Sequence, residues 1–172
     1  WQSRERYKSQ DELVGVVRKY RDLGVPLDGI VQDWQYWGDN YHWNATEFLA
    51  PTFSEPQKML DEVHAMNAHA AISVWPSFGP KTKPYAALAQ KGLLYDFKTF
   101  PVPAYDDPSE PSGVKVYDAF SAEARDIVWR NMNEGLFKYG IDAWWLDATE
   151  AELIDPTPAQ LDQPTALGSF RK

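Results

Sequence analysis

The chain has 172 residues, 44% of them hydrophobic, and a formal net charge of −8. Such a length and apolar content predict one domain with a hydrophobic core and argue against disorder. The acidic balance and the lack of a basic cluster argue against a nucleic-acid partner. The absence of cysteine excludes disulfides and thiolate metal sites, and no run of about 18 apolar residues predicts a membrane span.

The first predicted helix is followed directly by a short strand. Ser9 and Glu12 have the spacing of a capping box, and Gly24 is a helix stop. Residues 29–34, "GIVQDW", then read as a buried strand. The apolar stripe expected on the helix consists of Leu13, Val16, Val17 and Tyr20.

The same pattern returns in the second segment. Ser54 and Gln57 again suggest a capping box, Asn67 can end the helix in a left-handed conformation, and residues 70–76, "AAISVWP", predict a strand. The expected stripe here is Met59, Leu60, Val63 and Met66. A short helix over 84–91, ended by Gly92, and a Pro-rich insertion loop over 100–113 follow.

The third segment begins at Ser121, a candidate cap, and ends its helix at Gly140. Residues 142–147, "DAWWLD", predict a buried strand. The expected stripe is Ile127, Val128, Met132 and Leu136. Repeated helix–strand segments imply parallel strands with helical crossovers, hence an α/β fold.

A barrel is favoured over an open nucleotide-binding sheet because no Gly-rich phosphate loop follows any strand. A complete eight-fold barrel needs about 200–250 residues, and only three strands are evident, with the tail of another near Trp1. Residues 1–172 are therefore expected to be the N-terminal part of a (β/α)8 TIM-barrel domain, about strands 2–4 with their helices. The remainder of the barrel is the expected partner.

Carboxylates and aromatic side chains gather after the predicted strands. Asp33, Asp147 and Glu150 stand where parallel folds place their sites, and ionised groups there are costly unless they are paired or used. One interpretation is a glycosidase nucleophile or charge stabiliser. The structural alternative is helix capping or pairing with arginine.

Two further interpretations stay open. The three carboxylates could hold a divalent metal, but His42, His64 and His69 are not placed to serve as the base; His42, in an aromatic loop, could touch a ligand. The other is a non-catalytic carbohydrate-binding module, because the 8 Trp, 9 Tyr and 8 Phe include a cluster in "QDWQYWGDNYHW" (32–43) that suits sugar rings. Core packing explains part of that aromatic content.

At this point the motifs resemble a known family. "GIDAWWLDATE" is similar to the nucleophile region of glycoside hydrolase family 31, and "RERYKSQDELVGVVRKYRDLGVPLDGIVQDWQYW" and "AAISVWPSFGP" resemble its preceding barrel segments in the right order. The resemblance covers nearly the whole chain. It implies retaining hydrolysis of α-linked sugars without metal or cofactor.

The resemblance also implies residue roles. Asp147 matches the catalytic nucleophile, Asp33 the acid that holds hydroxyls of the −1 sugar, and Trp34 the residue on the C5 side of that sugar. The matched substrate-binding positions are Asp33, Trp34, Trp75, Trp145 and Glu150.

The chain departs from the family pattern in two places. Ala151 stands where the motif often has Pro, so a less rigid turn is expected after Glu150. The family's acid/base is an Asp on a later strand, and the sequence ends at Lys172 before that segment would arrive. The acid/base is therefore expected outside these residues, and the isolated chain is expected to be inactive.

At the position that the resemblance places on the C5 side, the indole of Trp34 is expected to favour xylose over glucose, because it would take the space of the glucose hydroxymethyl group. The alternative is that Trp34 turns away and packs between the barrel and its loops. The predicted activity is removal of α-xylosyl residues from xyloglucan-type oligosaccharides. The alternatives are an α-glucosidase or α-transglucosylase of the same family, or a non-catalytic carbohydrate-binding remnant. The compartment is left open by the sequence, and the resemblance favours a periplasmic or secreted protein.

Overall fold

The computed structural model describes residues 1–104, 107–150 and 152–169. These residues form two compact units, each built from separate stretches of chain. The first unit comprises residues 1–38, 46–74 and 132–147, and the second comprises residues 39–45, 75–131 and 148–172 apart from the undescribed positions. Within the described residues, no helix has both the length and the apolar character needed to cross a membrane.

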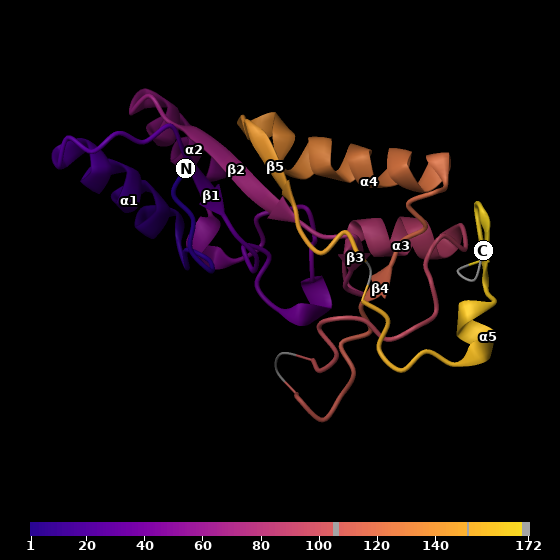
Figure 1. Ribbon diagram of the computed structural model, residues 1–172. Coiled ribbons are helices and arrows are strands. Elements are labelled where there is room, and N and C mark those ends of the chain that lie inside the picture. Colours follow the sequence, from indigo (N-terminus) through magenta and orange to yellow (C-terminus); the bar gives the residue numbers. More distant parts are fainter. Residues whose placement is uncertain (105–106, 151, 170–172) are drawn as a thin grey trace. The chain divides into compact units, whose positions relative to one another are not determined.

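A three-stranded parallel sheet forms the centre of the first unit, in the order β1-β2-β5 (Figure 1). Its strands are β1 (Gly29–Gln32), β2 (His69–Val74) and β5 (Ala143–Leu146), and both pairings are parallel. Gln2 adds a parallel bridge to Ile30, so a strand tail does lie near Trp1. The predicted parallel strands are therefore confirmed, and the sheet is open, as in a section of a TIM barrel.

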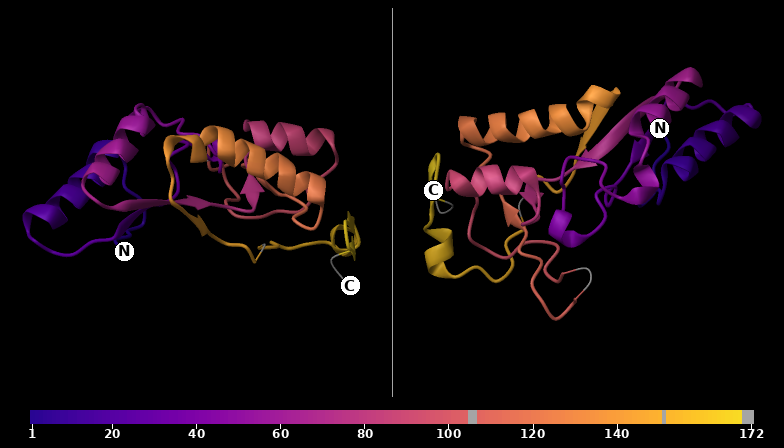
Figure 2. Two further views of the ribbon diagram at one scale, coloured as in Figure 1. Left: turned by 90° about the horizontal axis from the view of Figure 1, so that it is seen from above. Right: turned by 180° about the vertical axis from the view of Figure 1, so that it is seen from behind.

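Helices α1 (Gln10–Asp22) and α2 (Pro56–Ala65) pack against each other, α1 on β1 and α2 on β2 (Figure 2). The Ser9 hydroxyl accepts the Glu12 amide at 3.1 Å, as the capping box predicts. The other half of the box is absent from this helix, because the Glu12 carboxylate accepts the Lys8 amide instead. Gly24, with a φ of 64°, follows the helix end in the left-handed conformation.

Several details of the predicted helices were wrong. The buried residue on α1 is Val14 rather than Val16, beside Leu13 and Val17. Helix α2 has no capping box at Ser54, because Glu55 is its N-cap and Pro56, which lacks an amide hydrogen, takes the first helical position.

Helix α4 (Ala122–Gly135) begins after Ser121, whose hydroxyl accepts the Ala124 amide at 3.3 Å. Its predicted stripe is buried throughout. The helix stops earlier than predicted, and a 3-10 turn, η3 (Phe137–Tyr139), is ended by Gly140 with a φ of 99°. Gly140 is therefore the stop of η3 and not of α4.

The expectation that β5 is fully buried was also wrong. Ala143 and Trp144 are half-buried, while Trp145 is 51% and Leu146 64% exposed. The reason is its position in the sheet, since β5 is an edge strand that pairs only with β2 among the described residues.

The second unit contains α3 (Lys83–Gln90), ended at Gly92 as predicted, and a small antiparallel pair of β3 (Ser77–Phe78) and β4 (Lys115–Val116). Its last part carries α5 (Pro158–Leu161) and a two-stranded pair, β6 (Pro164–Thr165) with β7 (Gly168–Ser169). These strands are too short to carry a periodicity, so the sequence did not predict them. In the loop expected over 100–113, a bridge joins Pro103 to Pro111.

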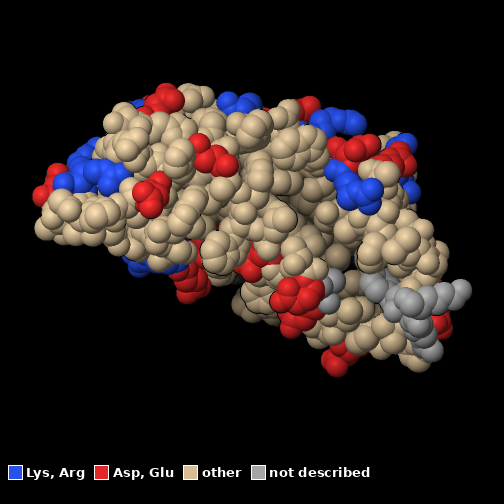
Figure 3. Space-filling view, turned by 45° about the horizontal axis from the view of Figure 1, so that its top comes forward, with Lys and Arg blue, Asp and Glu red and all other residues tan. Residues whose placement is uncertain are grey.

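Much of the aromatic cluster at 32–43 belongs to the core rather than to a ligand surface. Tyr36, Trp37 and Trp43 are at most 1% exposed. In the first unit the Tyr36 hydroxyl donates to the Ser73 carbonyl at 3.0 Å. Trp34 and Tyr41 are only half-buried. On the face drawn in Figure 3, charged side chains of both signs stand in small, separate groups among uncharged residues.

Candidate active site

Two carboxylates lie at the same edge of the parallel sheet. Asp33 follows the last residue of β1, and Asp147 follows the last residue of β5, with β2 between these two strands. The Asp147 amide donates to the Val74 carbonyl at 2.9 Å, which extends the ladder to the very end of β2. The residue after Asp147, Ala148, has a left-handed φ of 46°. The chain thus turns sharply once the carboxylate has been placed.

The surroundings of Asp33 disfavour its ionised form. Burial raises its pKa most, and the negative charge of Asp147 raises it further. The Trp34 amide, which donates to Asp33 Oδ1 at 2.8 Å, acts in the opposite direction. The mutual repulsion means that the two carboxylates are near enough to sense each other, as expected of a shared site.

Ser73 stands between the two carboxylate-bearing strands. On β2, Ser73 pairs with Trp145 of β5. Gln32, the last residue of β1, pairs with Ile72, so Asp33, the residue after Gln32, is level with Ser73. The Ser73 side chain is fully buried, and its hydroxyl makes no hydrogen bond of normal geometry to a described residue. It still lies close enough to lower the pKa of Asp33.

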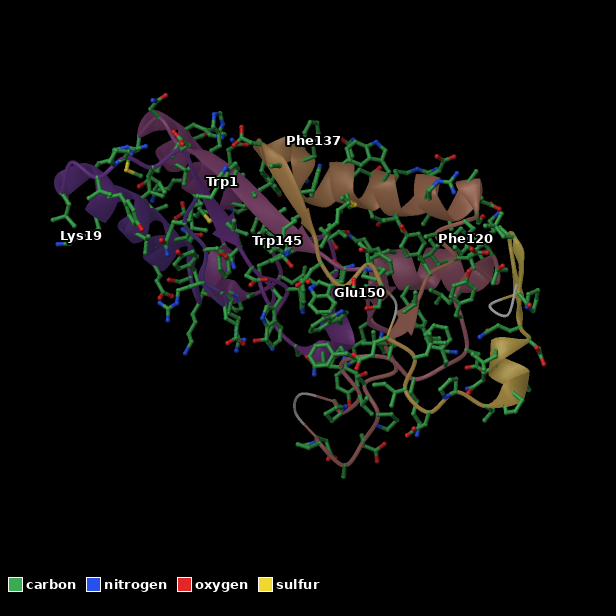
Figure 4. The ribbon with its side chains drawn as sticks, viewed as in Figure 1. Trp1, Lys19, Phe120, Phe137, Trp145 and Glu150 are labelled. Carbon is green, nitrogen blue, oxygen red and sulfur yellow. The ribbon has the colours of Figure 1, made fainter. Side chains whose placement is uncertain are left out.

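Trp145 and Trp34 flank this row. Trp145 projects from β5 near its carboxyl end, whereas Phe137 lies at the amino end (Figure 4). Arg6 covers the ring of Trp34, with its guanidinium carbon 4.3 Å from the ring centroid. Of the predicted set, Asp33, Trp34, Trp145 and Asp147 lie in the first unit, and Asp147 is near enough to Asp33 for its charge to raise the pKa of that carboxyl group.

Trp75 and Glu150 belong to the second unit. Trp75 packs edge-on against Trp43, with ring centroids 4.9 Å apart, and stacks on Phe100 at 5.8 Å. Its carbonyl accepts the Asn44 amide group at 2.6 Å. Glu150 is exposed, and Ala151, the predicted departure from the family motif, lies outside the described residues. A cavity of about 540 Å³ in this unit is lined by residues of 96–115 and Gln160, none of them a predicted site residue.

The histidines are engaged elsewhere. His42 shares a 2.9 Å hydrogen bond with Asp39 in the second unit. In the first unit, His64 and His69 both contact Asp142, at 2.8 Å and 3.1 Å. Across residues 1–104, 107–150 and 152–169, no group of three or more His, Asp or Glu side chains is arranged to hold a metal ion.

Sequence reasoning missed two residues, Arg6 and Ser73. Arg6 lies before the first helix, in a segment without a hydrophobic pattern. Its contact with Trp34 joins residues that are far apart in sequence, so only the folded chain reveals it. Ser73 was hidden inside an apolar strand. Only its position level with Asp33 indicates a role at the site, and that position is known only once β1 is paired with β2.

Comparisons with known proteins identify the family of the chain. The family model for the glycosyl hydrolases family 31 TIM-barrel domain matches residues 1–169. The chain therefore belongs to this family. It is 41% identical over 152 residues to an alpha-xylosidase of Saccharolobus solfataricus, a match that covers 88% of this chain and 18% of that protein.

Solved structures give the same fold. A family 31 alpha-xylosidase from Xanthomonas citri matches with a TM-score of 0.82 and 40% identity, over 98% of this chain and 19% of that one. A family 31 alpha-xylosidase from a soil metagenome, complexed with xylose, matches with a TM-score of 0.80 and 27% identity, over 99% of this chain and 24% of that one. The chain thus spans about a fifth of the length of these relatives.

Proposed function

We propose that this chain contributes the nucleophile and part of the sugar pocket of a retaining α-glycosidase. The observation that carries the proposal is the pair of carboxylates at one sheet edge, with the Asp147 charge raising the pKa of Asp33. A carboxylate at such an edge can stabilise an oxocarbenium-like transition state and then bond to the anomeric carbon.

In the proposed mechanism Asp147 attacks the anomeric carbon from the face opposite the leaving group. The α-glycosidic bond breaks, the leaving oxygen takes a proton from a general acid, and a β-linked glycosyl-enzyme forms. Water then attacks the same carbon and gives a proton back to the deprotonated acid, which releases the sugar in the α configuration and frees the Asp147 carboxylate. We assign no residue of this chain as the general acid. Asp33 accepts hydrogen bonds from sugar hydroxyls, and Trp145 presents an apolar face to the ring.

Trp75 and Glu150 complete the proposed set of substrate-binding residues. The half-buried indole of Trp75 offers apolar ring surface of the kind that suits a sugar face. Glu150 offers an exposed carboxylate for sugar hydroxyls. Both assignments rest on the family pattern.

The proposed substrate is an α-xyloside, such as a xylosyl side chain of a xyloglucan-type oligosaccharide. Trp34 supports this choice, because an indole beside C5 excludes a hydroxymethyl group and offers it no hydrogen-bond partner there. Excluding one small group changes kcat/KM by roughly 10–200-fold. The matched relatives from Saccharolobus and Xanthomonas carry the name alpha-xylosidase, which favours xylose over glucose.

The test compares p-nitrophenyl α-xyloside with the corresponding α-glucoside, using the full-length gene product. We expect a kcat/KM for the xyloside at least about tenfold higher, and Trp34→Ile to raise the glucoside value relative to the xyloside. A clear glucoside preference would reject the choice of sugar. Saturable sugar binding without turnover would favour a carbohydrate-binding role instead.

A further inference from the structure

Arg6 and Trp34 form a cation–π pair that joins the segment before α1 to the second residue after β1. The guanidinium carbon is 4.3 Å from the ring centroid, well within the distance at which a cation is attracted to the face of an indole. The Arg6 side chain is only 25% exposed, and partial removal from water strengthens such a contact. A planar guanidinium can also stack on the ring, which an ammonium cannot do.

The ring is a stronger partner for Arg6 than the carboxylate of Glu5, with which it forms an ion pair. The Arg6–Glu5 ion pair is long, at 3.4 Å, and the Glu5 side chain is 76% exposed. Exposed pairs of this kind contribute little. Arg6 also has a φ of 45°, a left-handed conformation that is unfavourable for a residue with a Cβ. Such conformations persist where the surroundings require them, often next to functional sites.

The backbone of Trp34 is held independently of Arg6. Its amide donates to Asp33 Oδ1 at 2.8 Å, and the next residue, Gln35, has a φ of 64°. The backbone of Trp34 is therefore fixed by its hydrogen bond to Asp33. The orientation of the indole about its side-chain torsions depends instead on the groups packed against the ring. Arg6 covers one face of the ring.

We propose that Arg6 is a positioning residue that holds the Trp34 indole in place and thereby sets the discrimination at C5 of the bound sugar. This inference rests on the proposed function. With the ring held, the volume beside C5 stays closed to a hydroxymethyl group. With the guanidinium removed, the ring loses the cation that covers one of its faces, and the indole orientations that admit the larger sugar become more populated.

The experiment measures kcat/KM for p-nitrophenyl α-xyloside and α-glucoside in Arg6→Gln and Arg6→Lys variants of the full-length gene product. Arg6→Gln should lower the xyloside-to-glucoside ratio by about three- to tenfold, as the loss of one cation–π contact implies. Arg6→Lys keeps the charge but loses the planar stacking, so an intermediate ratio is expected.

Arg4→Gln is the matched control. Arg4 stands in the same segment and pairs with Glu12 at 2.8 Å, and its guanidinium carbon lies 5.9 Å from the ring of Tyr7 rather than Trp34. The ratio should stay at its wild-type value in this variant. Thermal unfolding of all variants checks that the comparison is made on folded protein.

A double-mutant cycle separates positioning from general structural damage. In a Trp34→Ala background, Arg6→Gln should leave the ratio unchanged. The inference is overturned if Arg6→Gln lowers both activities equally, or if it still shifts the ratio when Trp34 is absent. The wild-type ratio tests the proposed sugar preference separately, because a change caused by Arg6 can be measured whichever sugar is preferred.

Discussion

The carboxyl group of Asp33 is subject to opposing influences. Burial and the Asp147 charge raise its pKa, while the Trp34 amide and the Ser73 hydroxyl lower it. A group in this position changes charge with small changes in its surroundings. The neighbours of Asp33 are therefore expected to set the lowest pH at which the proposed sugar-binding carboxylate is ionised.

Ser73→Ala should move the acidic limb of the kcat/KM profile to higher pH. The variant loses the hydroxyl that lowers the pKa of Asp33, so Asp33 stays protonated up to a higher pH than in the wild type. The change should be confined to the acidic limb, and activity on the alkaline side of the optimum should change least. Ser3→Ala, at an exposed position, is the control, and an unshifted acidic limb in Ser73→Ala would contradict the prediction.

Asp147→Ala should reduce kcat by at least about 10³-fold, which is roughly 4 kcal/mol in barrier height. The space left by the carboxylate can admit azide, a small anionic nucleophile. Azide should restore turnover of an activated α-xyloside and yield the β-glycosyl azide, because it attacks from the face that Asp147 occupied. Activity within tenfold of wild type, or an α-configured azide product, would contradict the assignment of Asp147.

At the scale of single elements, two helix glycines differ in the space around them, and this difference decides whether a larger residue fits. A Cβ added at Gly135, at the end of α4, would lie 1.9 Å from the Thr46 carbonyl oxygen, within the first unit. A Cβ added at Gly15, inside α1, would meet nothing within 4 Å. The same substitution therefore has opposite expected effects at the two sites.

Gly135→Ala should lower the free energy of unfolding by about 1–3 kcal/mol through overpacking. Gly15→Ala should raise it by about 0.5–1 kcal/mol, since alanine is the better helix former and loses less backbone entropy. Urea unfolding of both variants tests the pair. Equal effects of the same sign would mean that helix propensity, and not the contact with Thr46, governs position 135.

Asp142 ties α2 to the amino ends of β2 and β5. Its carboxylate accepts the Ala70 amide at 2.8 Å and contacts His64 and His69. Burial raises the pKa of Asp142, but these three partners more than offset that effect and lower it overall. Because the folded-state pKa is below the ordinary value of about 3.9, the ionised group stabilises the fold above that pH. The contribution is lost as the pH falls through the folded-state pKa.

Asp142→Ala should therefore lower the free energy of unfolding at neutral pH by about 1–3 kcal/mol. The difference from wild type should fade below about pH 4, where the unfolded carboxyl group is protonated. Asp142→Asn keeps an oxygen that can accept the Ala70 amide, so a smaller loss is expected. Urea midpoints measured across the pH range test this, and a loss that does not vary with pH would contradict it.

For the whole molecule, the parallel strands and the edge that carries the carboxylates could be predicted, because helix–strand alternation restricts the topology. The cap of α2 could not, since Pro56 displaced the expected motif. The exposure of Leu146 was missed because an apolar run looks alike in a central and an edge strand. The Arg6–Trp34 contact joins residues that only the folded chain brings together.

Strands β2 and β5 are neighbours in the sheet but are joined by a long connecting segment of the chain. Ala71 pairs with Ala143, and roughly 70 residues intervene, yet each doubling of a flexible loop adds only about 0.6 kcal/mol to its closure entropy. Inserted sequence between these strands is thus thermodynamically cheap, provided that it packs on itself. Such a crossover can therefore change in length and sequence while the strands that precede Asp33 and Asp147 keep their register.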